Sequence, residues 1–195
     1  MRKILASLAG ALTLASVGVP LETRAAAGAG VVDTSFTTAD GARTLQQSIV
    51  IDAPVAILWK AFSDTAEFKR WNSPVAAIDF KVGGTLEASY DPKAVLGARD
   101  NIKHRIVTYL PERLIVFQNI QAPRALPDGE LFQNTVTVIE YQPLAPRGTR
   151  VTVSSTGWGT GAGYDRLYRF FQGGNAELLQ AMKKAYEAAP AGAGR

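Results

Sequence analysis

The stretch from Leu45 to Trp71 predicts a β-strand that is followed at once by two short helices. Residues 48–51 (Ser-Ile-Val-Ile) are mostly β-branched, which favours a strand. Pro54 ends this strand, and its fixed φ suits the first turn of a helix. An apolar helical stripe follows at the spacing i, i+3, i+4, i+7, formed by Val55, Leu58, Trp59 and Phe62. Asp64 and Glu67 have the spacing of a capping box, so a second helix is expected to begin at Asp64.

The rest of the chain consists of short strand patterns separated by turn signals, and this arrangement favours antiparallel pairing. The expected strands are 76–82, 85–90, 102–109, 114–120, 132–141 and 149–155. A final helical segment is expected from Tyr164, with an interruption at Gly173-Gly174 and a restart capped by Asn175. On this helix Lys183 and Lys184 fall on the polar face. The predicted fold class is therefore α+β.

The order of these segments resembles the START-like superfamily, also called SRPBCC, in its ATPase-activator-homologue and polyketide-cyclase-like branches. The resemblance begins with the strand, Ala53-Pro54, the helix that carries Trp59, and the second helix before Trp71. It continues, in the order that the family has them, through Phe80–Thr85, Pro111–Leu114 and Gly148–Val153. It covers about residues 44–187.

This resemblance implies a helix-grip fold, in which a curved antiparallel sheet closes over an internal cavity with the long C-terminal helix. One face of that helix would then be core and cavity lining at once, and a Gly-rich loop at 157–163 would act as its hinge. The residues expected to bind a ligand are Trp59, Ile102, His104, Ile106, Trp158, Tyr164, Tyr168, Phe171, Leu178 and Met182.

Two residues are weak candidates for acid–base chemistry. His104 is the only histidine in the chain, and on its strand it shares a face with Ile102 and Ile106. Glu87 also lies on an expected strand. A hydrogen-bonded core or rim histidine and a solvent-facing glutamate are the competing interpretations of these two residues.

Other classes of site are disfavoured. The chain has no cysteine, which excludes a thiolate metal site, and its single histidine argues against an imidazole cluster. The glycines at 157 and 159 match a loose dinucleotide fingerprint with Ala162, but no βαβ unit follows them. Neither a metal nor a cofactor is expected. Removal of residues 1–27 would take away three basic residues and one acidic residue and lower the formal net charge from +4 to +2, which is too little to indicate nucleic-acid binding.

Residues 1–27 have the pattern of a secretory signal peptide. Arg2 and Lys3 precede an uncharged run, Ile4–Val19, and Ala25-Ala26-Ala27 offers a cleavage site. The alternative is a membrane anchor, but the run is shorter than the roughly 20 residues that span a bilayer. We expect a flexible lead-in at 28–43, the helix-grip domain at 44–188 and a disordered tail at 189–195. The protein would then be periplasmic or secreted, with no membrane span after signal removal.

Binding of a small hydrophobic or aromatic ligand is the expected function. One alternative is a cyclase, dehydratase or hydrolase that acts in the same cavity. Another is a protein-interaction module, as the ATPase-activator resemblance implies, although the chaperone partner of that branch is cytosolic. The sequence does not set the oligomeric state.

The signal pattern predicts a mature N-terminus near Gly28. N-terminal sequencing or intact-mass analysis of the exported protein measures it directly. A mass that includes Met1 would show that the segment is retained.

Overall fold

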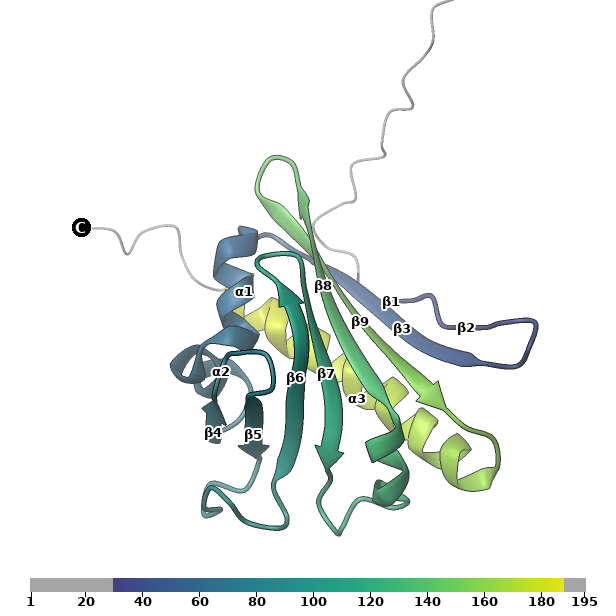
Figure 1. The fold of residues 1–195 in the computed structure, drawn as a ribbon. Helices are drawn as coiled ribbons and strands as arrows, with labels where there is room; N and C mark the ends of the chain where they lie inside the picture. Colours follow the sequence, from purple (N-terminus) through teal and green to yellow (C-terminus); the bar gives the residue numbers. More distant parts are fainter. Residues whose placement is uncertain (1–29, 188–195) are drawn as a thin grey trace, which may run out of the picture.

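The computed structural model describes residues 30–187 and shows a curved antiparallel sheet that is crossed on one face by a long helix (Figure 1). Within this range the strands are β1 (Val32–Asp33), β2 (Phe36–Thr37), β3 (Arg43–Ile51), β4 (Val75–Ile78), β5 (Thr85–Ser89), β6 (Ile102–Leu110), β7 (Leu114–Gln121), β8 (Val136–Leu144) and β9 (Gly148–Trp158). The helices are α1 (Val55–Ser63), α2 (Thr65–Trp71), the 3-10 helix η1 (Gly129–Asn134) and α3 (Ala162–Glu187). Neighbouring strands follow the order β1-β3-β9-β8-β7-β6-β5-β4, and β2 also pairs with β3. The α+β helix-grip prediction is confirmed.

The strand and the two helices expected between Leu45 and Trp71 are present as β3, α1 and α2. Asp64 caps α2 through its side chain, which accepts a hydrogen bond from the backbone N–H of Glu67 at 2.9 Å. The indole Nε1 of Trp71 donates to the carbonyl oxygen of Ala61 at 3.0 Å, and this bond ties the end of α2 back to α1. The two helices therefore pack as one unit at one end of the sheet (Figure 1).

The C-terminal helix α3 is continuous, so the interruption expected at Gly173-Gly174 is wrong. Each glycine weakens a helix by about 1 kcal/mol relative to alanine. Here Leu167 on one side of the pair and Leu179 on the other are each 1% exposed, and their burial holds the helix together across it. Asn175 accordingly lies inside α3 and does not cap a restart. No helix within residues 30–187 is long and apolar enough to cross a membrane.

The segment expected to be a flexible lead-in also needs correction over the part that the structure describes. Val32 pairs with Ser48, and Phe36 pairs with Thr44, so β1 and β2 extend the sheet beside β3. The pattern was missed because each strand has only two residues, too few for an alternation to be recognised. The signal peptide at 1–27 and the tail at 189–195 lie outside the described residues.

Two further boundaries differ from expectation. The strand expected at 76–82 ends at Ile78, after which Phe80 packs against Trp59 with ring centroids 5.7 Å apart. The strand expected from Phe132 begins only at Val136, because Gly129–Asn134 form η1. In both cases the aromatic side chain packs from a turn that leaves the sheet, with Phe80 half-buried and Phe132 buried.

The buried side chains form two separate clusters. The larger one packs α1 and α2 and the C-terminal half of α3 against the sheet, and it includes Leu58, Leu179 and Met182. The smaller one lies under the N-terminal half of α3 and consists of Leu45, Ala122, Phe132, Trp158 and Leu167. Figure 1 shows α3 running from the end of β9 to the side of α1, so it connects the two clusters.

Lys183 is not a simple surface residue, contrary to the sequence pattern. Its Nζ donates to the carbonyl oxygen of Val50 on β3 at 2.7 Å and to Glu187 Oε1 at 2.7 Å. The side chain thus attaches the last turns of α3 to the sheet. The neighbouring Lys184 is exposed and suits the role of a surface control.

The clusters predict different costs for two substitutions in α3. Leu179→Ala should lower the free energy of unfolding by about 2–5 kcal/mol, because Leu179 is fully packed. Lys184→Ala should change it by less than about 0.5 kcal/mol. Urea denaturation measures both values. Equal midpoints for the two variants would show that the buried face of α3 is wrongly assigned.

Candidate functional site

A cavity of about 660 Å³ lies between the middle of α3 and the sheet face that the helix covers. Residues of both core clusters line it, so it occupies the space between them. Gly174 lines it from α3, and a Cβ built on Gly174 would meet no atom within 4 Å. The glycine therefore leaves space at the helix side of the cavity.

The walls are mostly apolar and rich in aromatic rings. The lining aromatic side chains are Phe62, Phe68, Trp71, Tyr90, Phe117, Phe132, Phe170 and Phe171. Phe132 of η1 stacks on Phe171 of α3, with ring centroids 4.6 Å apart and an interplanar angle of 7°. Such walls favour an apolar or aromatic molecule.

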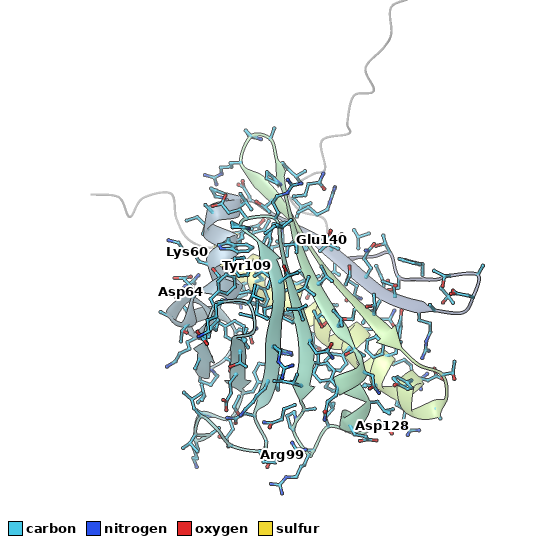
Figure 2. All side chains as sticks on the ribbon, in the orientation of Figure 1. Lys60, Asp64, Arg99, Tyr109, Asp128 and Glu140 are labelled. Carbon is cyan, nitrogen blue, oxygen red and sulfur yellow. The ribbon has the colours of Figure 1, made fainter. Side chains whose placement is uncertain are left out.

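The opening is marked by the lining residues that are exposed, among them Tyr90, Pro127 and Phe170. Two loops, 90–101 and 122–128, lie at this end of the sheet. Figure 2 shows Arg99 and Asp128 there, well away from Tyr109 and Glu140.

Side-chain bonds hold these loops. Arg99 donates to the carbonyl oxygen of Ala122 at 2.8 Å, which joins one loop to the other. Asp128 pairs with Arg166 at 2.8 Å, which joins the second loop to α3. These two bonds therefore hold the loops at the rim of the cavity in place.

Strand register places three polar residues in two adjacent rows across the sheet side of the cavity. Thr137 on β8 pairs with Ser155 on β9 and, on its other side, with Phe117 on β7. His104 on β6 pairs with Asn119, two residues after Phe117, so it lies in the next row. His104, Thr137 and Ser155 all line the cavity. The floor of an otherwise apolar space thus offers one imidazole and two hydroxyl groups.

His104 is held by a chain of buried hydrogen bonds. Its Nδ1 lies 2.7 Å from Oδ1 of Asn119, which is 0% exposed. Nδ2 of Asn119 donates to Oγ1 of Thr135 at 2.6 Å, and that hydroxyl donates to the carbonyl oxygen of Phe132 at 2.7 Å. The imidazole is therefore fixed in orientation by residues of β7 and of the turn before β8.

Burial lowers the pKa of His104 to about 4, and the hydrogen bond with Asn119 only partly opposes this effect. The rings of Phe117 and Phe132 lie beside it at centroid distances of 5.7 and 6.0 Å. His104 is therefore uncharged at neutral pH. A neutral imidazole can accept a hydrogen bond or take up a proton.

A second polar group reaches the cavity from α3. Nδ2 of Asn175 is buried and has no hydrogen-bond partner among the residues that the structure describes. Asn175 follows Gly174 in the chain, and both residues line the cavity. An unpaired buried amide is costly, so this position also favours a polar partner inside the cavity.

Of the residues expected to bind a ligand, four line the cavity: Ile102, His104, Phe171 and Leu178. The other six are packed elsewhere. Trp59 lies among Phe80, Tyr109 and Tyr141, with its ring 5.7 Å from those of Phe80 and Tyr141.

The remaining five expected lining residues belong to the clusters on either side. Ile106 and Met182 are fully buried in the larger cluster. The ring of Trp158 packs on that of Tyr168 in the smaller cluster, with centroids 5.2 Å apart. The hydroxyl oxygen of Tyr164 accepts a hydrogen bond from Nδ2 of Asn134 at 2.8 Å. Of the three aromatic residues of α3 expected to bind a ligand, Tyr164, Tyr168 and Phe171, only Phe171 lines the cavity.

The Gly-rich loop that was expected to act as a hinge is closely packed. Gly157 has a φ of +84°, and a Cβ there would lie 2.2 Å from the carbonyl oxygen of Asn134. Arg43 donates to the carbonyl oxygen of Gly159 at 2.6 Å and pairs with Asp165 at 2.6 Å. These contacts fix the start of α3, and the opening lies at the other loops.

Glu87 does not line the cavity. Its Oε1 accepts hydrogen bonds from the backbone N–H of Gly97 and from Nδ2 of Asn101, both at 2.6 Å, and Lys103 lies 3.5 Å from its Oε2. The carboxylate thus anchors the 90–101 loop that borders the opening. Its oxygens are occupied, which makes Glu87 a structural residue.

Asn119, Thr137, Ser155 and Asn175 were missed by the sequence reasoning. For Thr137 and Ser155 a signal existed, since each alternates in phase with an inward apolar residue of its own strand, Ile139 or Val153. Within residues 30–187 no three His, Cys, Asp or Glu side chains are grouped so that they could hold a metal ion.

His104→Gln should reduce the loss of folding stability that occurs as the pH falls from 6.5 to 4. An imidazole in the unfolded chain takes up a proton near pH 6.5, whereas the pKa of His104 in the folded protein is about 4. Between these values the unfolded chain binds more protons than the folded protein. The free energy of unfolding of the natural protein therefore falls by roughly 2–3 kcal/mol over this range, and that of the variant does not. Urea denaturation at pH 7, 5.5 and 4.5 measures this difference. Parallel pH profiles for the two proteins would contradict the burial of a neutral His104.

Comparison with known proteins agrees with this architecture. Residues 52–187 match the family described as Activator of Hsp90 ATPase homolog 1-like protein. No curated protein matches the chain.

Similar solved structures share the fold at low sequence identity. The Aha1 dimer from Colwellia psychrerythraea is 16% identical with a TM-score of 0.59, over 74% of this chain and 96% of that one. CalU16 from Micromonospora echinospora is 17% identical with a TM-score of 0.56, over 83% of this chain and 85% of that one. Protein MLL2253 from Mesorhizobium loti is 17% identical with a TM-score of 0.61, over 76% and 99%. With the family match over most of the helix-grip domain, the chain belongs to the Activator of Hsp90 ATPase homolog 1-like family, within the START-like superfamily.

Proposed function

We propose that this protein binds a small, mostly apolar molecule in the cavity beneath α3. The observation that carries the proposal is the cavity of about 660 Å³ between the two core clusters. Protein interiors are close-packed, and few of their voids exceed the size of a water molecule. A space of this size within an otherwise packed fold falls in the range of small-molecule sites.

The lining supports an apolar ligand. Aromatic and aliphatic side chains form the walls, and the polar groups among them are few and converge from the sheet and from α3. Burying apolar ligand surface here would supply the affinity, at roughly 25 cal/mol per Å² before the costs of association. The polar groups would set the orientation of the molecule.

An enzymatic role is the second candidate, and His104 is the observation that favours it. A neutral imidazole inside a cavity can act as a general base. Among the described lining residues, however, the other titratable side chains are Tyr90 and Glu177, and both are exposed. A single buried group suits ligand orientation better than paired acid–base catalysis.

We also propose that the protein acts outside the cytoplasm, because residues 1–27 carry the pattern of a signal peptide. The family name refers to an activator of the ATPase of Hsp90. Export would separate this chain from cytosolic ATP, so chaperone activation ranks below ligand binding.

Binding can be tested with N-phenyl-1-naphthylamine, an uncharged fluorescent hydrophobe. The natural protein should bind it saturably, at about one molecule per chain. Thr137→Phe places a ring into the cavity from β8 and should weaken binding about tenfold or more, because the ring occupies the space of the ligand.

Val138→Phe is the matched control, since the next residue of the strand points to the opposite face of the sheet. This variant should bind as the natural protein does. Absence of saturable binding to the natural protein, or equal affinities for both variants, would refute the proposed site.

A further inference from the structure

The three polar residues on the cavity floor are unusual for their position. His104, Thr137 and Ser155 occupy inward positions at which other strand residues, such as Leu86 and Val153, are apolar. A polar group at such a place costs stability unless it finds a hydrogen-bond partner. The hydrogen bonds that these residues make, and the donor and acceptor atoms that they leave without a partner, therefore describe the partner that is missing.

The proton on the imidazole of His104 can be placed from its neighbours. The hydroxyl of Thr135 donates to the carbonyl oxygen of Phe132, so its oxygen is free to accept from Nδ2 of Asn119. This fixes the amide of Asn119 with Oδ1 toward His104. An amide oxygen can only accept, so Nδ1 of His104 carries the proton.

The other ring nitrogen, Nε2, then carries a lone pair. No hydrogen bond to Nε2 is present within the described part of the chain, while the residue lines the cavity. Because burial keeps the ring uncharged, Nε2 is an acceptor at neutral pH. A molecule that fills the cavity without a donor at this point would leave that lone pair unpaired.

The donor that fits is an uncharged one. A buried ammonium group would need a carboxylate partner, and the one carboxylate among the described lining residues is Glu177, which lies exposed on α3. A hydroxyl group needs no counter-ion. An uncharged donor on an otherwise apolar molecule therefore suits the site, and the hydroxyl of an alcohol or a phenol is such a donor.

We infer that the ligand of this cavity is a hydroxylated apolar molecule whose O–H donates to Nε2 of His104, and that Asn119 is the positioning residue that presents Nε2 as an acceptor. This inference rests on the proposed function, because it names the chemical class of the molecule that binds there. It makes His104 the residue that determines specificity.

The test compares 2-naphthol with 2-methylnaphthalene, two probes of nearly the same shape that differ in a hydroxyl and a methyl group. Their dissociation constants are measured by fluorescence titration at pH 7. His104→Leu should raise the ratio of the 2-naphthol constant to the 2-methylnaphthalene constant about tenfold, since the hydrogen bond is lost for only one probe. Ile102→Leu, also in the lining of β6, should leave the ratio unchanged.

A second measurement needs no substitution. His104 is the only histidine, so its imidazole nitrogens give the only histidine ring signals in the ¹⁵N NMR spectrum of the labelled protein. At pH 7 we expect a proton on Nδ1 and none on Nε2. Addition of 2-naphthol should shift the Nε2 signal, and 2-methylnaphthalene should leave it nearly in place.

The outcomes separate the two proposals. The inference is overturned if the ratio of the two dissociation constants is the same in the natural protein and in His104→Leu and the Nε2 signal does not shift. The cavity would then bind ligands without recognising a hydroxyl group. A proton found on Nε2 in the free protein would overturn it as well. If neither probe binds, the proposed function fails and the inference fails with it.

Discussion

The structure depends on the way α3 is attached to the sheet at both ends, with Gly174 facing the cavity between the two attachments. Leu167 anchors its first half in one cluster, and Leu179 and Met182 anchor its second half in the other. Between them Gly173 and Gly174 carry no side chain, although a Cβ at either would meet nothing within 4 Å. The helix spans the gap because burial on both sides outweighs the low helix propensity of the pair. The cavity follows from this arrangement.

The polar groups around the cavity divide into those that hold its rim and those that face its interior. The carboxylate of Glu87 accepts hydrogen bonds that hold the 90–101 loop, and Asp128 forms an ion pair with Arg166 of α3. Asn119 uses both ends of its amide, because it holds Nδ1 of His104 and donates to Thr135. His104 lines the cavity, and its Nε2 has no hydrogen bond within the described residues. In the proposed site the apolar walls would provide affinity, and Nε2 of His104 would orient the ligand.

Much of the fold could be predicted from the sequence, because Pro54, the apolar stripe of α1 and the cap at Asp64 are local signals that agree with the tertiary structure. The prediction of a break at Gly173-Gly174 was wrong because the low helix propensity of glycine is overridden by tertiary packing, which no local pattern reveals. The site was predictable only in part. Inward phase could be read for His104, but which inward side chains face the cavity and which meet another element, as Ile106 does, depends on where α3 crosses the sheet.

The central claim is that the space beneath Gly174 and Leu178 is a binding site and not a flaw in packing. A crystal structure of the protein isolated from its own cells, with no ligand added, tests it most directly. The account predicts a space of about 660 Å³ that contains a bound molecule or ordered solvent, with an oxygen atom at hydrogen-bond distance from Nε2 of His104. A space closed by the rings of Phe117, Phe132 and Phe171 would contradict it.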